Sequence, residues 1–380
     1  MSEPRFTATD AQAFVRAVLL AKRGAGHVEP NPCVGAVIHV DGRIVAEGFH
    51  AEYGEAHAEE AALAAFTATN AGEVDRRAAT LVVTLEPCSS SGGAKKREPC
   101  VEAIVASGIG RVVIGADDPD PRHQGRAYER LRAAGVEVVV APRGTVPEEL
   151  LAPFRRHLRS GRPHLVLKWA QTSDGRWSLP GRRYLASDES LRAVHRLRAH
   201  CDAIAVGSGT LLADDPLLTV RPPELRTIAR PLIRIVLDGR GRAPTDSQLF
   251  RTAALGPVWW ITGRAGVPSV SANPPTPSGV ERIELAQPHD LADSLLPELR
   301  RRGVARLLVE GGPTLAAALL AAGVVDRLLV FVAPDRPDAD PRDQAAFDAS
   351  LRRLLGSSAM PRLEAVELSG CDACFQLSFS

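Results

Sequence analysis

The sequence feature that most constrains the fold is a repeated alternation of short apolar runs, typical of strands, with amphipathic runs, typical of helices. The first series opens with a helix capped by Thr9 or Asp10, followed by two apolar segments that flank the turn Asp41-Gly42, a hairpin signal. Helices and strands then alternate, an order typical of α/β layers. The expected strands are 34–40, 44–49, 81–85, 112–114 and 136–140, and the expected later helices are 57–68, 99–107 and 126–134.

The alternation stops between Ala141 and Arg162, where the sequence is rich in Pro, Arg and Glu and has no strand signal. The second series is expected to contain strands 164–169, 203–206, 233–237, 258–261, 306–309 and 327–332, helices 188–200 and 313–322, and loops 266–279 and 334–348. A chain of 380 residues exceeds the roughly 100–200 residues of a typical domain. We therefore expect two α/β domains, 1–160 and 161–380.

The charge balance and the N-terminus limit the function classes. Lys and Arg total 46 against 45 Asp and Glu, a net charge of +1, which argues against a surface that coats nucleic acid. The N-terminus has no apolar signal-peptide region, and no run approaches the about 18 apolar residues of a membrane span. We therefore expect a cytoplasmic protein, in which the 6 cysteines are reduced thiols or metal ligands. Cys33 and Cys201 are expected in cores, and the role of Cys371 and Cys374 stays open.

A set of residues in the first half has the chemistry of a catalytic zinc site. His57 lies two residues before Glu59 at the start of an expected helix, Cys88 follows an expected strand, and Cys100 opens the next helix. One imidazole and two thiolates suit Zn²⁺ and leave a position for water, whose pKa the metal lowers toward about 7. Glu59 is expected to carry protons from that water to a ring nitrogen and a departing amine. Zinc deaminases show this order with shorter cysteine spacing, whereas Cys88 and Cys100 enclose eleven residues.

The second half carries two glycine turns rather than a dinucleotide-binding Rossmann signature. No G-x-G-x-x-G follows an expected strand. The turns GSGT at 207–210 and GGPT at 311–314 each follow a strand and lead into a helix. Glycines let the backbone approach a ligand, and helix N-termini attract phosphate. Taken alone, each turn is better explained as a structural turn than as a cofactor site.

Together these motifs resemble one family, the bifunctional deaminase/reductases of riboflavin biosynthesis. The resemblance is carried by residues 26–35, 56–59, 85–88 and 125–126 in the first half, and by 167–170, 174–176, 194–198, 206–210, 213–221 and 309–315 in the second. It covers most of residues 10–330. It implies an N-terminal cytidine-deaminase-like three-layer α/β/α domain and a C-terminal dihydrofolate-reductase-like α/β domain that uses NADPH.

The resemblance also implies roles for single residues. In the first domain His57, Cys88 and Cys100 would hold one Zn²⁺ per chain, Glu59 would be catalytic, and Asn31 and His50 would contact substrate. In the second, NADPH would be contacted by Ala170, Tyr184, Thr210, Asp214, Gly312, Pro313 and Thr314, and substrate by Arg182, Arg198, Leu218, Arg221 and Glu310. Arginine suits a phosphorylated substrate because it binds phosphate bidentately and stays charged. For Arg198 and Arg221 a solvated helix face and a loop charge stay open as alternatives. Lys168 is expected to assist hydride transfer, although a strand lysine paired with an acid explains it equally well.

The sequence departs from the family pattern near both sites. The segment between Cys88 and Cys100 is three residues longer than usual, and Ser90 stands where the family has histidine. Arg182 and Tyr184 replace a serine and a tryptophan, and the usual L-G-G after Ala333-Pro334 is missing. These departures leave the exact substrate open.

We predict a bifunctional enzyme that uses zinc and water to remove the 2-amino group of diaminohydroxyphosphoribosylaminopyrimidine and then reduces the ribosyl group to ribityl with NADPH. The expected partner is this small phosphorylated pyrimidine, without nucleic acid or membrane, and the resemblance implies a homo-oligomer. One alternative keeps both chemistries for a related pyrimidine or deazapurine pathway. A second is a reductase with a non-catalytic zinc domain, and a third is a nucleic-acid deaminase with an appended binding domain.

Overall fold

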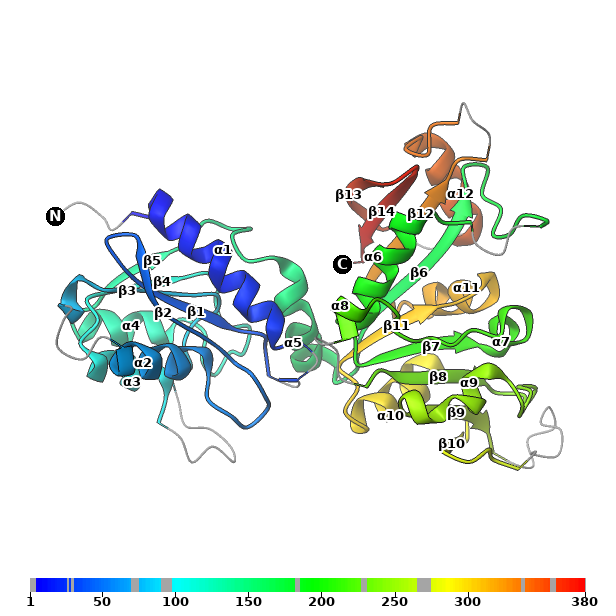
Figure 1. The fold of residues 1–380 in the computed structure, drawn as a ribbon, viewed down its shortest axis with the longest axis horizontal. Helices are drawn as coiled ribbons and strands as arrows, with labels where there is room; N and C mark the ends of the chain where they lie inside the picture. Colours follow the sequence, from blue (N-terminus) through cyan, green and yellow to red (C-terminus); the bar gives the residue numbers. More distant parts are fainter. Residues whose placement is uncertain are drawn as a thin grey trace. The chain divides into compact units, whose positions relative to one another are not determined.

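The computed structural model describes residues 5–25, 27–28, 31–69, 75–89, 98–181, 185–226, 231–264, 275–335, 339–355 and 360–379. The chain divides into two units, Met1–Ser160 and Gly161–Ser380. Each unit contains its own β-sheet with helices packed against it (Figure 1). Within the described part of the chain, no helix is long and apolar enough to cross a membrane.

The sheet of the first unit has the strand order β2-β1-β3-β4-β5. Its strands are β1 (Gly35–Val40), β2 (Arg43–Phe49), β3 (Thr80–Val83), β4 (Arg111–Ile114) and β5 (Glu137–Val140). β1 runs antiparallel to β2 and β3, and β3, β4 and β5 are parallel. The predicted hairpin is confirmed, because Asp41 and Gly42 at its turn both have positive φ, 49° and 83°.

Helices cover both faces of this sheet. They are α1 (Ala8–Arg23), α2 (Ala58–Thr69), α3 (Cys100–Ser107), α4 (Arg126–Ala133) and α5 (Glu148–Ser160). A Cβ atom at Gly35 would lie 2.0 Å from a backbone atom of α1, and one at Gly48 would lie 2.4 Å from a backbone atom of α2. Gly35 pairs directly with Phe49, so Gly35 and Gly48 face opposite sides of the sheet. α1 and α2 therefore form the outer layers of the expected α/β/α arrangement (Figure 1).

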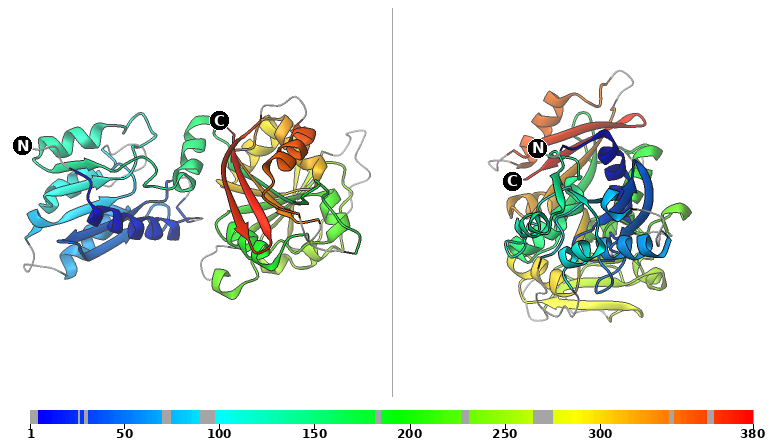
Figure 2. Two further views of the ribbon diagram at one scale, coloured as in Figure 1. Left: turned by 90° about the horizontal axis from the view of Figure 1, so that it is seen from above. Right: turned by 90° about the vertical axis from the view of Figure 1, so that its left-hand side faces the viewer.

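The sheet of the second unit has the strand order β10-β9-β8-β7-β11-β6-β12-β14-β13. Its strands are β6 (His164–Thr172), β7 (Ala203–Gly207), β8 (Ile233–Asp238), β9 (Val258–Gly263), β10 (Val280–Leu285), β11 (Arg306–Glu310), β12 (Arg327–Ala333), β13 (Arg362–Ser369) and β14 (Asp372–Ser378). The strands from β10 to β12 in this order are parallel. The hairpin of β13 and β14 extends the sheet with antiparallel pairing and forms one edge, drawn in red in Figure 2.

Helices pack on both faces of the second sheet as well. They are α6 (Asp188–Ala199), α7 (Ser208–Asp214), α8 (Pro223–Arg226), α9 (Gln248–Arg251), α10 (Leu296–Arg301), α11 (Pro313–Ala321) and α12 (Gln344–Leu355). Leu165, Leu167 and Trp169 of β6 join a core cluster with residues of α10, α11 and α12. The alternate residues Val166 and Ala170 pack instead against the cluster that contains residues of α6. Because side chains alternate along a strand, Lys168 shares the α6 face of the sheet.

The structure corrects several sequence expectations. Helix α1 is capped by Thr7, not by Thr9 or Asp10. The Thr7 hydroxyl accepts the N–H of Asp10 at 3.1 Å, and the Asp10 carboxylate accepts the N–H of Thr7 at 2.7 Å. This reciprocal pair is a capping box, in which the acid stands three residues after the cap.

The C-terminal part of the chain differs most from the prediction. The segment 334–348 was expected to be a loop, but α12 begins at Gln344, where the carboxylate of Asp343 accepts the N–H of Ala346 at 3.0 Å.

The sequence pattern also did not predict α5, β10, β13 or β14. Most of the expected loop 266–279 lies outside the described residues, and residues 275–279 form no regular element.

Candidate active sites

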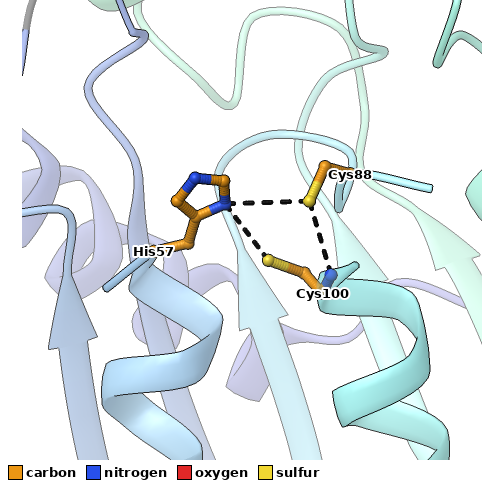
Figure 3. Close-up of side chains that lie close together, drawn as sticks. All are labelled: His57, Cys88 and Cys100. Atoms are coloured by element: carbon orange, nitrogen blue, oxygen red, sulfur yellow. Dashed lines mark hydrogen bonds between the residues drawn. The ribbon is translucent and has the colours of Figure 1, made fainter. Parts of the chain in front are cut away.

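Three side chains of the first unit converge from three elements (Figure 3). His57 directly precedes α2, Cys88 follows β3, and Cys100 is the first residue of α3. Their ligand atoms all lie within 4.8 Å of one another. Nδ1 of His57 lies 3.2 Å from Sγ of Cys100 and 3.7 Å from Sγ of Cys88. The structure thus brings together the three residues predicted as metal ligands.

The start of α2 orients His57. The carboxylate of Glu60 accepts the N–H of His57 at 2.8 Å, and the N–H of Ala61 donates to the His57 carbonyl at 3.0 Å. Glu60 is not among the predicted site residues, although an acid three residues after a helix cap is a recognisable capping signal in a sequence. Glu60 therefore fixes the backbone that carries the imidazole.

The two thiols are coupled to each other and to a helix end. The N–H of Cys100 lies 3.4 Å from Sγ of Cys88, and the N-terminal end of a helix favours negative charge. The hydrogen bond from the Cys100 thiol lowers the pKa of Cys88 to about 3, and the same bond, together with burial, raises the pKa of Cys100. Two sulfurs and one imidazole nitrogen at this separation are a donor set that fits Zn²⁺.

Helix α4 holds the chain on both sides of Cys88. The buried carboxylate of Glu86 accepts the N–H of Ala127, in the first turn of α4, at 3.1 Å. Arg130, one turn further along α4, donates to the carbonyl oxygen of Ser89. Cys88 is thus fixed through both of its neighbouring segments, which limits the movement of its sulfur.

Glu59 lies in the same unit with its side chain almost fully buried, at 4% exposure. Burial raises the pKa of Glu59, His57 opposes this shift and the Cys88 thiolate adds to it, so that the pKa lies at about 7. A carboxyl group with a pKa near neutrality can both accept and donate a proton at working pH, as a general acid–base catalyst must.

Asn31 and His50 form a hydrogen-bonded pair next to the cysteine and histidine cluster. Nδ1 of His50 lies 2.9 Å from the carbonyl oxygen of Ala56, so Nδ1 carries the proton. Nε2 of His50 therefore accepts from the Asn31 amide nitrogen at 3.1 Å. The His50 and His57 rings meet edge to face, 5.2 Å apart. This tautomer leaves the Asn31 side-chain oxygen as an acceptor.

Some predicted site residues lie outside the described part of the chain. Ser90, with most of the segment between Cys88 and Cys100, is one, and Arg182 and Tyr184 are others. Their predicted roles in substrate and cofactor binding stay predictions.

The second unit gathers its predicted substrate residues around Glu310, at the end of β11. The Glu310 side chain is 13% exposed, and its carboxylate accepts hydrogen bonds from Nε and Nη2 of Arg198 at 2.7 and 2.9 Å. Nζ of Lys168 lies 3.7 Å from the same carboxylate. Burial alone would raise the pKa of Glu310, but Arg198 and Lys168 outweigh it and hold that pKa at about 2. Burial lowers the pKa of Lys168, and the Arg198 charge adds to this while Glu310 opposes it.

The segment that follows α7 completes this cluster. Nη1 of Arg198 donates to the carbonyl oxygen of Thr219 at 3.0 Å, and Nε of Arg221 donates to Nε2 of His195 at 3.1 Å. Leu218 has a φ of 54° and is 3% exposed within a core cluster. His195 was missed in the sequence, although its spacing of three from Arg198 on one helix is a usable signal.

The predicted cofactor residues that the structure describes lie at the carboxyl ends of neighbouring strands. β7 and β6 both pair with β11, and Gly312 caps α11 directly after β11. A Cβ atom at Gly312 would lie 3.6 Å from Oγ1 of Thr210, so the two glycine turns adjoin. The described members of this set are Ala170, Thr210, Asp214, Gly312, Pro313 and Thr314. Ligands of parallel α/β sheets bind at such an edge.

Known families and proteins match both units. Residues 8–116 match the cytidine and deoxycytidylate deaminase zinc-binding region, and residues 163–335 match the RibD C-terminal domain. The riboflavin biosynthesis protein RibD of Aquifex aeolicus is 38% identical over 322 residues, 84% of this chain and 85% of that protein. The protein of that name from Escherichia coli is 35% identical over 381 residues, 97% of this chain and 99% of the relative.

Solved structures resemble the chain over nearly its whole length. A diaminohydroxyphosphoribosylaminopyrimidine deaminase/5-amino-6-(5-phosphoribosylamino)uracil reductase from Thermotoga maritima has a TM-score of 0.75 at 30% identity. That match covers 97% of this chain and 98% of the other. RibD from Acinetobacter baumannii matches with a TM-score of 0.72 at 28% identity.

Proposed function

Because the chain belongs to the RibD family of riboflavin-biosynthesis enzymes, we propose that its two sites carry out the two consecutive steps of that family on one phosphorylated pyrimidine. The protein is a bifunctional enzyme, a zinc-type deaminase joined to a reductase. Its first domain is cytidine-deaminase-like and its second is a dihydrofolate-reductase-like RibD reductase domain. The substrate is diaminohydroxyphosphoribosylaminopyrimidine, which loses its 2-amino group to water before its ribosyl group is reduced to ribityl. The alternatives of another pathway or a silent zinc domain are not favoured by these relatives.

We assign the deamination to residues 1–160. His57, Cys88 and Cys100 would hold Zn²⁺, which supplies a Lewis acid that activates water at neutral pH. Glu59 would take the proton released there and deliver it to the pyrimidine, since its pKa of about 7 suits both directions. Asn31, whose side-chain oxygen accepts, would orient the pyrimidine by accepting from an N–H or amino group of the ring.

We assign the reduction to residues 161–380. NADPH, which supplies the hydride, would be bound by Ala170, Tyr184, Thr210, Asp214 and residues 312–314. Lys168 would polarise the sugar carbonyl or imine, and Glu310 would keep that lysine in place through their ion pair. The rest of the substrate would be bound by Arg182, Arg198, Leu218, Arg221 and Glu310, with arginine holding the phosphate.

The observation that carries the deaminase assignment is the convergence of the two thiols and one imidazole beside the buried Glu59. The test uses zinc-loaded protein and the diaminopyrimidine substrate, with ammonia release and NADPH oxidation followed separately. We expect ammonia first and NADPH oxidation second, and Glu59→Gln to abolish ammonia release while reduction of pre-deaminated substrate continues. Absence of both signals with wild-type protein would contradict the proposal.

A homo-oligomer is a further expectation from the resemblance. Sedimentation velocity across a range of protein concentrations checks it. A species at the mass of one 40.5 kDa chain at all concentrations would contradict it.

A further inference from the structure

We propose that His195 is a positioning residue of the reductase site, which holds the guanidinium of Arg221 ready for the phosphate group of the substrate. This inference rests on the proposed function, in which Arg221 binds substrate. It assigns a role to a buried side chain that the catalytic scheme above does not use.

Helix α6 places two polar side chains against the segment that carries Arg221. His195 and Arg198 lie three positions apart, so they share one face of the helix. Nη1 of Arg198 holds the carbonyl oxygen of Thr219 at 3.0 Å, and Nε2 of His195 accepts from Nε of Arg221 at 3.1 Å. The helix therefore fixes first the backbone of the segment and then, two residues later, its arginine side chain.

The direction of the second bond defines the state of the imidazole. An arginine Nε–H only donates, so Nε2 of His195 must be unprotonated, and the neutral ring carries its proton on Nδ1. The surroundings favour this neutral form. Burial lowers the pKa of His195 to about 4, the charges of Arg198 and Arg221 lower it as well, and Glu310 and the Thr219 backbone oppose the shift. The acceptor is therefore present throughout the neutral pH range.

The geometry suits the recognition of a phosphate. The bond to His195 uses Nε of Arg221 and does not consume the two Nη groups, which together grip a phosphate. His195 is 6% exposed, whereas Arg221 is exposed, so a fixed buried group anchors a side chain that reaches solvent. Ordering a long side chain before the ligand arrives removes part of the entropy cost of binding.

Arg198 and Arg221 thereby take different tasks. Three nitrogen atoms of Arg198 already donate to Glu310 and to the Thr219 carbonyl. Arg198 consequently organises the cluster, and Arg221, anchored through Nε alone, is the arginine better suited to meet the phosphate. A purely structural His195 would affect all substrates alike, whereas a positioning residue acts through the phosphate.

The test compares reduction of the deaminated substrate with reduction of its dephosphorylated counterpart by full-length protein. The readout is the ratio of kcat/KM for the two substrates. We expect His195→Leu to lower this ratio about tenfold, the effect of losing one hydrogen bond to a charged group, mainly through KM of the phosphorylated substrate. His195→Gln, which retains an acceptor, should restore most of the ratio. His200→Leu, a histidine change at the end of the same helix, is the matched control and should leave the ratio unchanged.

Arg221→Ala separates the inference from the proposed function. If it lowers the ratio and adding His195→Leu lowers it no further, both stand. An unchanged ratio in Arg221→Ala would overturn the proposed role of Arg221 and the inference with it. A lowered ratio in Arg221→Ala with equal losses for both substrates in His195→Leu and in His195→Asn would overturn the inference alone. Should His195→Leu not fold, His195→Asn, which keeps a polar side chain too short to reach Arg221, is expected to lower the ratio in its place.

Discussion

Each unit of the molecule buries a glutamate at the centre of its site, and the two carboxyl groups have opposite acid–base properties. Glu59 in the first unit is 4% exposed and has its pKa raised to about 7. Glu310 in the second unit is 13% exposed and has its pKa held at about 2. Burial raises the pKa of both groups, so burial does not explain the difference.

The difference comes from fixed positive charge. Two permanent or near-permanent cations, Arg198 and Lys168, lie within 3.7 Å or less of the Glu310 carboxylate. Around Glu59 the charges oppose each other, because His57 favours ionisation of the carboxyl group and the Cys88 thiolate works against it. Glu59 is thus suited to move a proton, while Glu310 is suited to remain an anion and hold other groups in place.

The largest expected effect comes from removing the carboxyl group that transfers protons in deamination. Glu59→Gln keeps the size and polarity of the side chain but cannot accept a proton, so deamination should fall by about 10²–10⁴-fold. Ammonia release in single-turnover assays measures this loss. Zinc content and reduction of pre-deaminated substrate should match wild type, and a parallel loss of reduction would mean that the change had disturbed the whole chain.

Removing the fixed anion should damage stability as well as activity. Glu310→Gln leaves Arg198 and Lys168 facing a neutral amide, and breaking a mostly buried ion pair in this way costs about 3–5 kcal/mol. Chemical denaturation, monitored by hydrogen exchange of peptides from β6 and β11, should show this loss of stability in the second unit. Ammonia release should continue, and equal destabilisation of β3 peptides would contradict the assignment of this network to one unit.

The two reactions should differ in their response to pH. Glu59 must be ionised to accept a proton, and its pKa lies near 7, so deamination should fall about tenfold per pH unit below that value. Glu310 has a depressed pKa, so the stability that it contributes is fully present above pH 4.5 and is lost only as the pH falls toward about 2. Separate pH–rate profiles between pH 5 and 8 measure the contrast, and an acid limb near 7 that Glu59→Gln leaves unchanged would assign that limb to another group.

The smallest effect concerns the support of the zinc ligands. Glu60→Ala removes the acceptor for the His57 N–H at the start of α2, which should cost about 1 kcal/mol of stability. Zinc affinity, measured by competition with a chelator, should fall about tenfold because His57 is less well held. Glu55→Ala, on the segment before α2, is the control and should leave affinity unchanged.

The sequence predicted the parts of the sites that depend on local order. His57, Cys88 and Cys100 each stand at an end of a predicted element, so their convergence follows from the α/β order of the first domain. The ion pair between Arg198 and Glu310 joins residues 112 positions apart, and no local pattern shows that they meet. The sequence likewise suggested an acid partner for Lys168 but did not name Glu310 as that acid.

Misplaced elements have similarly local explanations. Thr7 lies outside the apolar periodicity of α1, so the sequence pattern favours Asp10 as a cap, whereas Asp10 is the capping-box partner of Thr7. The strand β13 exposes most of its length at the sheet edge and lacks a buried face, which removes the alternation that reveals a strand. The segment 334–348 begins with acidic residues and prolines, which are typical of a loop, so its sequence did not indicate the helix that begins at Gln344.

The contrast between the two glutamates is tested most directly by ¹³C NMR of full-length protein labelled at the glutamate carboxyl carbon. Glu59→Gln and Glu310→Gln assign the two resonances by their disappearance. The account predicts that the Glu59 resonance titrates near pH 7 and that the Glu310 resonance stays that of an anion down to at least pH 4. Titration of both groups together near the ordinary glutamate value of 4.5 would contradict it.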